Sequence, residues 1–206
     1  MSRHAKKISA DLKKTYPDAG CSLSFHSPLE LLVATILSAQ CSDDQVNKVT
    51  PKLFRQFHSA KDYATVPLAQ LEEAIRTTGF FHNKAKNIQN ACRKIIETFS
   101  GQVPDTMESL VSLPGVGRKT ANVVLSNGFG RLEGIVVDTH VFRLSHRLGL
   151  VNGNTPEKAE LELMQLFPQA DWAYVSHALI LHGRKVCSAR KPQCSDCPMK
   201  KICPQL

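Results

Sequence analysis

Four of the seven cysteines lie close together near the end of the chain. Cys187, Cys194, Cys197 and Cys203 follow the spacing C-x6-C-x2-C-x5-C. Thiolates crowded into one short loop would repel each other unless a cation or a cluster neutralised them. Zinc sites usually contain two close cysteine pairs, whereas an iron–sulfur cluster held by four thiolates tolerates one close pair and two wider gaps. The spacing therefore favours an iron–sulfur cluster, with zinc second and disulfides or free thiols third.

A second candidate is the turn Leu113-Pro114-Gly115-Val116-Gly117, which separates two segments of helical periodicity. Its two glycines permit a tight hairpin whose backbone N–H groups can approach an oxyanion. The N-terminus of the following helix adds its positive dipole end, so a phosphate could be bound there. Such a turn alone is more often an ordinary connection, but Arg118 and Lys119 follow it at once and favour a phosphate site.

Lys119 and Asp138 are the residues whose types suit covalent chemistry. Lys119 falls in the first turn of a helix, where the dipole disfavours positive charge, and a neutral amine is what a nucleophile requires. The local sequence alone still favours a solvated or phosphate-binding lysine. Asp138 is placed to cap the helix that follows it. A helix over 118–128 and an extended return could bring Asp138 back toward Lys119.

The elements that must position these residues are helices. Ser27 and Glu30 form an N-cap and its capping-box partner before one apolar periodic segment, and Asp105 and Glu108 do so before another. The only β-like run, 135–137, is too short to found a sheet. The sequence therefore predicts an all-α fold.

Composition narrows the class of protein. The chain has 206 residues, 42% of them hydrophobic, and a net charge of +8, so a compact protein that meets a polyanion is expected. Nucleic acid and an acidic membrane surface both fit that charge. No stretch approaches the length of a membrane span, and the basic N-terminus has no apolar core of a signal peptide. The cysteines are therefore expected in a reducing compartment, where disulfides are rare.

These residues together resemble the endonuclease III family of helix-hairpin-helix DNA repair glycosylases over nearly the whole chain. Leu113–Ala121 matches the family hairpin with its catalytic lysine, and Val137–Val141 matches the segment with its catalytic aspartate. The four cysteines match the family's [4Fe–4S] loop, with His182–Arg184 ahead of it as in relatives. Gln40–Asp43 resembles the loop whose glutamine enters the DNA stack. The resemblance raises iron–sulfur well above zinc.

The resemblance implies a two-lobed fold that binds damaged double-stranded DNA. A six-helix lobe over 24–134 would carry the hairpin, and 1–23 plus 135–206 would form the cluster lobe. DNA would lie in the cleft between them, with Lys119 and Asp138 on opposite walls of one pocket. Lys119 would attack the sugar C1′ and form an imine while Asp138 stabilises the developing charge, and β-elimination would then nick the strand. The implied activity is that of a bifunctional DNA glycosylase and AP lyase acting on oxidised pyrimidines.

The resemblance and the basic charge also suggest contacts to DNA. Gln40 and Phe80 would fill the gap left by the flipped base, although Phe80 could instead be a core aromatic beside Phe81. The expected DNA-binding residues are Gln40, Phe80, Gly115, Gly117, Arg118, Arg190 and Lys191. Solubility alone could explain the last two.

Some residues depart from the family pattern. At the position of Phe80, the family commonly has an aliphatic residue that fills the gap in the DNA stack and is called the wedge. At the position of Cys41, small or hydroxyl residues are usual. His82 and Asn83 in the wedge loop have no evident chemical role. His140 is expected either to support the pocket or simply to occupy its helix.

Two other functions compete with the leading one. A monofunctional mismatch or adenine glycosylase would lack a lysine at position 119, and the adenine-specific ones carry a further C-terminal domain, whereas this sequence stops soon after Cys203. A non-catalytic DNA-binding module with a structural metal would need neither Lys119 nor Asp138. We expect a monomer in a prokaryotic cytoplasm, associated with the nucleoid.

Overall fold

The structure, a computed structural model, describes residues 2–205. Within these residues there is no β-strand, which confirms the all-α prediction. The chain forms two compact units. One is Ser22–Arg131, and the other is built from both chain ends, up to Cys21 and from Leu132 onward.

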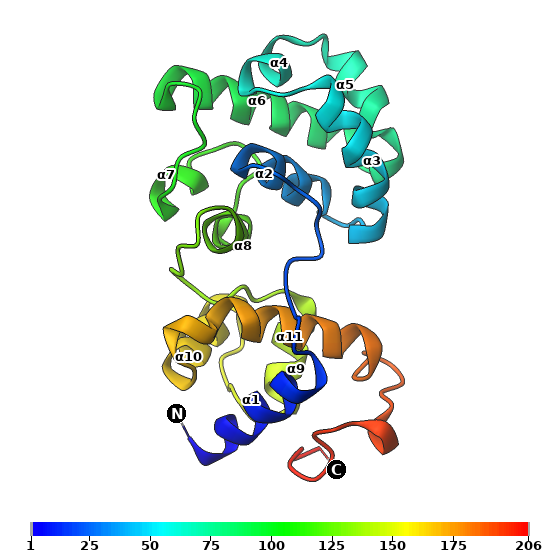
Figure 1. Cartoon of the computed structure of the whole chain (residues 1–206), viewed down its shortest axis with the longest axis vertical. Coiled ribbons are helices and arrows are strands. Elements are labelled where there is room, and N and C mark those ends of the chain that lie inside the picture. Colours follow the sequence, from blue (N-terminus) through cyan, green and yellow to red (C-terminus); the bar gives the residue numbers. More distant parts are fainter. Residues whose placement is uncertain (1, 206) are drawn as a thin grey trace. The chain divides into compact units, whose positions relative to one another are not determined.

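The unit Ser22–Arg131 is organised on one long helix. Its elements are α2 (Pro28–Leu37), α3 (Asp43–Gln56), α4 (Ala60–Thr65), α5 (Leu68–Ile75), the 3-10 turn η1 (Arg76–Thr78), α6 (Phe81–Phe99), α7 (Met107–Val111), α8 (Arg118–Val123) and the π-helical turn η2 (Val124–Gly128). Helices α4 and α5 lie along α6, as Figure 1 shows, and α2 contacts α6 as well. Ile88 and Ile95 of α6 are fully buried, so its apolar face anchors this core.

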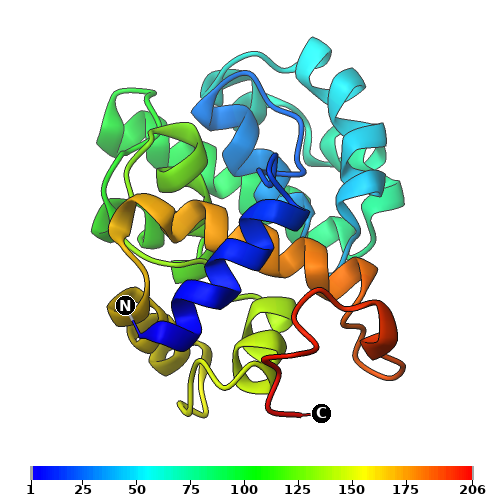
Figure 2. The same ribbon diagram turned by 60° about the horizontal axis from the view of Figure 1, so that its bottom comes forward.

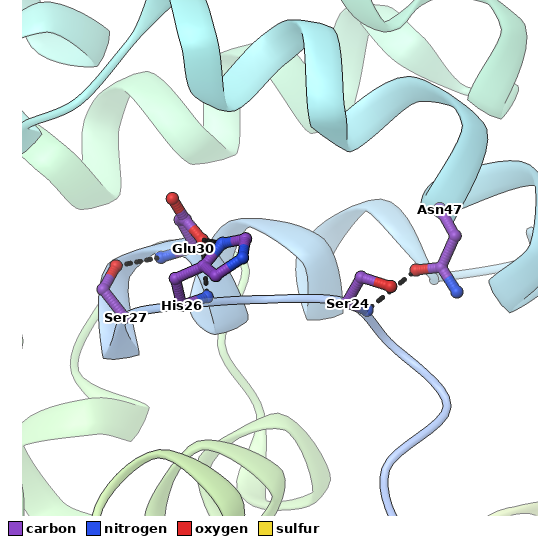
Figure 3. A network of polar contacts seen from close by, with 5 residues as sticks. All are labelled: Ser24, His26, Ser27, Glu30 and Asn47. Carbon is purple, nitrogen blue, oxygen red and sulfur yellow. Dashed lines mark hydrogen bonds and ion pairs between the residues drawn. The ribbon is translucent and has the colours of Figure 1, made fainter.

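The start of α2 is held by side-chain caps (Figure 3). The Ser27 hydroxyl accepts from the Glu30 N–H at 3.2 Å, which confirms the predicted N-cap. The Glu30 carboxylate accepts from the His26 N–H at 2.6 Å. In a reciprocal capping box it would accept from the N–H of the N-cap residue, Ser27, so the bond is displaced by one residue from the predicted pattern. Asn47 of α3 accepts from the Ser24 N–H at 2.9 Å, so this segment is also tied to the next helix.

The predicted cap at Asp105 is wrong by one residue. Thr106 is the N-cap of α7, and its hydroxyl accepts from the Ser109 N–H. Asp105 instead binds the Arg131 guanidinium at 2.6 Å. Asp and Thr both suit the position, so the sequence pattern did not distinguish them.

The second unit contains α1 (Arg3–Thr15), α9 (Thr139–Arg147), α10 (Pro156–Leu166), the short turn η3 (Gln169–Asp171), α11 (Trp172–Lys185) and the turn η4 (Cys194–Asp196). Figure 2 shows α1 lying across α11. Ile8 and Leu12 of α1 are fully buried in a core shared with α9, α10 and α11. A Cβ on Gly183 would lie 3.0 Å from the Cβ of His140, so glycine permits the close approach of α11 to α9.

Two buried groups of the first unit serve its core rather than chemistry. Cys92 is 1% exposed on the apolar face of α6, and burial raises its pKa to about 12. Burial likewise raises the pKa of the neighbouring Tyr63 hydroxyl. Across residues 2–205, no helix combines the length and apolar character that crossing a bilayer requires.

Candidate functional site

The predicted hairpin is a tight turn between α7 and α8. The Val116 N–H donates to the Leu113 carbonyl at 3.1 Å, and Gly115 has φ +77°. Proline second and a left-handed glycine third are the signature of a type II turn. Leu113 and Val116 are buried and anchor the turn, while Gly115 and Gly117 are exposed.

Gly115 meets a second constraint from α6. A Cβ at this position would lie 2.8 Å from the Cβ of Asn87. A Cβ on Gly117 would meet nothing within 4 Å, and the φ of Gly117 is −93°. Gly115 is therefore required by its left-handed backbone and by its contact with Asn87, whereas a side chain at position 117 would meet no neighbour.

Helix α8 begins without a side-chain cap. Gly117 is its N-cap and makes no side-chain hydrogen bond to the first turn, in contrast to Asp138 of α9. Lys119 is exposed in this first turn, beside Arg118. The exposed hairpin thus places two cations next to a helix N-terminus whose N-cap residue supplies no side-chain hydrogen bond.

Asp138 caps α9 as its sequence predicts. Its Oδ1 accepts from the N–H groups of His140 and Val141, both at 2.8 Å. In the described part of the chain, no hydrogen bond to its Oδ2 is found, so one carboxylate oxygen caps the helix and the other is available. Asp138 belongs to the second unit and Lys119 to the first.

Gln40 and Phe80 lie in the same unit and line the same cavity. This cavity of about 240 Å³ is also lined by Gly115 and Thr120 of the hairpin region. Phe80 is 65% exposed, which excludes the alternative of a core aromatic. Both residues have a left-handed backbone conformation, with φ of 52° for Gln40 and 48° for Phe80.

Two histidines singled out from the sequence, His82 and His140, make polar contacts within their own units. His82 lies 3.0 Å from the Glu72 carboxylate, which joins the start of α6 to α5. His140 lies 3.2 Å from a guanidinium nitrogen of Arg143. Cys41 is half-buried beside Gln40.

All four cysteines of the C-terminal loop line one cavity of about 240 Å³. Burial raises the pKa of the Cys197 thiol, and the other three cysteines raise it further, since thiolates repel each other. Among the described residues, no three His, Cys, Asp or Glu side chains are close enough to hold a single metal ion. Four cysteine side chains around one cavity are the donor set that an iron–sulfur cluster uses.

Arg147 holds this loop, a role the sequence did not indicate. Its guanidinium donates to the Ser188 carbonyl at 2.8 Å, to the Ala189 carbonyl at 2.7 Å, and to the Cys187 sulfur at 3.3 Å. Arg143, one turn earlier on α9, donates to the Cys187 carbonyl at 2.9 Å. Their i,i+4 spacing was the available signal, because it places both on one helix face.

His182 connects the loop to the N-terminal helix. It is 1% exposed, lies 3.0 Å from the Tyr16 hydroxyl and has its Nε2 3.5 Å from the Cys197 sulfur. Burial lowers the pKa of His182 to about 4, so it is a neutral imidazole at neutral pH. Arg190 and Lys191 are exposed on the same loop.

The two hairpin glycines should respond differently to alanine. We expect Gly115→Ala to lower the free energy of unfolding by about 1–2 kcal/mol, because of backbone strain and the contact with Asn87. Gly117→Ala should change it by less than about 0.5 kcal/mol. Urea denaturation measures both, and equal losses would contradict the different roles assigned to the two positions.

Comparison with protein families gives one match that covers most of the chain. Residues 33–169 match the HhH-GPD superfamily base excision DNA repair protein model. Curated relatives include endonuclease III of Synechocystis, 56% identical over 98% of this chain and 92% of the relative. Endonuclease III of Bacillus subtilis is 47% identical over 91% of this chain and 86% of the relative, and that of Escherichia coli K12 is 40% identical over 96% and 93%.

Solved structures agree with this match. A trapped endonuclease III–DNA covalent intermediate, an estranged-adenine complex, is 43% identical with a TM-score of 0.93, over 100% of this chain and 97% of that chain. A thermostable thymine-DNA glycosylase, 23% identical over 98% and 96% of the two chains, shares the fold with a TM-score of 0.87. The match to the family model and the sequence identity to endonuclease III over nearly the whole chain show that this chain belongs to the endonuclease III family of the HhH-GPD superfamily.

Proposed function

We propose that this protein is a bifunctional DNA glycosylase and AP lyase of base excision repair that releases oxidised pyrimidines from duplex DNA. The observation that carries the proposal is the 43% identity to an endonuclease III trapped covalently on DNA. A covalent intermediate needs a nucleophile, and the exposed Lys119 at the hairpin supplies one. A glycosylase that only hydrolyses the base would not need an amine there.

The chemistry follows from the two side-chain types. The neutral Lys119 amine attacks C1′, the C1′–N bond breaks, and the base leaves with those electrons and takes up a proton. Lys119 is then bound to C1′ and has lost a proton. The C1′–O4′ bond breaks, the ring oxygen takes up a proton, and the protonated imine that forms acidifies the C2′ proton. Loss of this proton breaks the C3′–O bond, so the 3′ phosphate leaves by β-elimination.

Asp138 acts as the charged partner of this reaction. Its Oδ1 is held by two N–H donors, which fixes the carboxylate without neutralising it. The other oxygen stabilises positive charge as it develops on the sugar. Both residues act on one nucleotide, which must first leave the base stack at a cost of a few kcal/mol.

The DNA contacts divide between the backbone and the gap in the stack. The uncapped N–H groups after Gly117, together with Arg118, bind phosphate oxygens. Arg190 and Lys191 of the cysteine loop add salt-sensitive phosphate contacts. Gln40 and Phe80 fill the gap, where the exposed aromatic ring of Phe80 stacks on a neighbouring base.

The four loop cysteines hold a [4Fe–4S] cluster in this proposal. All four line one cavity, and Arg147 donates to the Cys187 sulfur as it would to a ligating thiolate. A bound cluster would supply positive charge that offsets the repulsion between the thiolates, and these four cysteines would then fix the loop that carries Arg190 and Lys191. The glycosylase and lyase steps themselves use Lys119 and Asp138.

Lys119→Gln should abolish the covalent adduct that borohydride traps on a duplex with one thymine glycol, because an amide cannot form an imine. Strand cleavage should also disappear, while binding to the damaged duplex is retained. Lys61→Gln is the matched control, since Lys61 is an exposed lysine on α4 of the same unit. An adduct that persists in Lys119→Gln would remove this lysine from its role.

Two substitutions at Asp138 separate capping from chemistry. Asparagine is as good an N-cap as aspartate, so Asp138→Asn should keep the thermal stability but lower single-turnover base release by about a hundredfold. Asp138→Ala should lose the same activity and also about 1 kcal/mol of stability. Unchanged base release in Asp138→Asn would show that the carboxylate is needed only as a cap.

Cys197→Ala should lose bound iron, sulfide and the visible absorbance of an iron–sulfur chromophore, because the cluster would lack one of its four thiolates. Cys21→Ala is the control, because Cys21 lies outside the loop and should leave the iron content unchanged. Metal and sulfide analysis of both purified variants checks the assignment. Zinc without iron in the wild-type protein would contradict the cluster.

A further inference from the structure

Lys84 is a buried cation that the proposed chemistry does not use. It lies in the first turns of α6 and is 4% exposed. Burial lowers the pKa of its ammonium group, while the nearby Cys41 raises it. Burying a charge is costly, and a positive charge near a helix N-terminus is unfavourable, so stability of α6 alone does not explain this residue.

Its hydrogen bonds show what the charge does. The Lys84 ammonium donates to the Leu37 carbonyl at 2.8 Å and to the Thr78 carbonyl at 2.7 Å. Leu37 is the last residue of α2, and Thr78 is the last residue of η1. Carbonyl groups at helix ends lack partners within the helix and carry partial negative charge. One ammonium therefore caps two helical segments at once.

Each capped segment leads directly into a residue proposed to enter the DNA. Gln40 follows Leu37 by three residues, and Phe80 follows Thr78 by two. Both are non-glycine residues in the left-handed region, a conformation that costs roughly 1–2 kcal/mol each and persists only when its surroundings enforce it. Both line one cavity together with Lys84.

We propose that Lys84 is a positioning residue that fixes the Gln40 and Phe80 loops at the spacing needed to fill the two sides of an opened base pair. This inference rests on the proposed function. At 4% exposure Lys84 does not bind phosphate itself, so it acts through the two loops. Its ammonium joins segments about forty residues apart in the sequence.

The test compares duplex DNA with single-stranded DNA, since a single strand has no partner base and leaves no gap to fill. The protein is the full chain, and the variant is Lys84→Met, which has a similar length without the charge. Lys86→Met is the matched control, because Lys86 is exposed on the same helix and loses the same charge. The readout is the single-turnover rate of borohydride-trapped adduct formation at a preformed abasic site.

We expect Lys84→Met to lower the duplex rate by at least about tenfold and the single-strand rate by less than about twofold. Lys86→Met should leave the ratio of the two rates unchanged. If Lys84→Met lowers both rates equally, the residue supports the fold in general and the positioning role is wrong. If neither rate falls, the role is also wrong.

A second readout needs no chemistry. A duplex with a tetrahydrofuran abasic analogue opposite 2-aminopurine should fluoresce more strongly when wild type or Lys86→Met binds and unstacks that base. Lys84→Met should bind without this rise, and a full rise would overturn the inference. If the wild type forms no adduct on either DNA, the proposed function fails, and this fluorescence still decides the role of Lys84.

Discussion

The hydrogen bonds and contacts of helix α6 are the constraint on which the first unit depends. Lys84 holds the ends of α2 and η1, Asn87 packs against Gly115 of the hairpin, and Lys94 donates to the Ser112 carbonyl at 2.8 Å just before that hairpin. The buried face of α6 also carries the core. One helix therefore sets the spacing of three short loops, and sites supported by a helix are placed more precisely than sites on loops alone.

Helix α9 has the same function in the second unit. Asp138 caps its first turn, and Arg147 in its last turn holds the cysteine loop by two carbonyls and one sulfur. A cation is favourable at a helix C-terminus, so Arg147 suits its helix as well as its loop. The Asp138 carboxylate and the cysteine loop are thus fixed to opposite ends of one nine-residue helix. The position of the cysteine loop, where we propose the cluster, is therefore linked through α9 to the position of Asp138.

The features that sequence could predict are those with local causes. The turn at Gly115, the cap at Asp138 and the cysteine spacing each depend on a few adjacent residues, and the first two appear in the structure as expected. Thr106 displaced Asp105 as a cap because neighbouring residues of equal propensity cannot be ranked by pattern. Lys84 and Arg147 were missed because Leu37 lies 47 residues from Lys84 and Ser188 lies 41 residues from Arg147, and nothing local indicates a buried lysine or a guanidinium that binds a distant loop.

Gln40 and Phe80 show most clearly that this surface is not arranged for stability. Glycine would relieve the left-handed backbone at both positions, and removal of the 65% exposed Phe80 ring would take apolar surface out of water. Gln40 is exposed, and no hydrogen bond to its side chain is found within residues 2–205. The fold therefore has strained backbone and exposed side chains at Gln40 and Phe80. The buried ammonium of Lys84 binds the segment that precedes each of them. Strain of this kind is retained where a ligand needs the side chains already in place, because ordering them on binding would cost affinity.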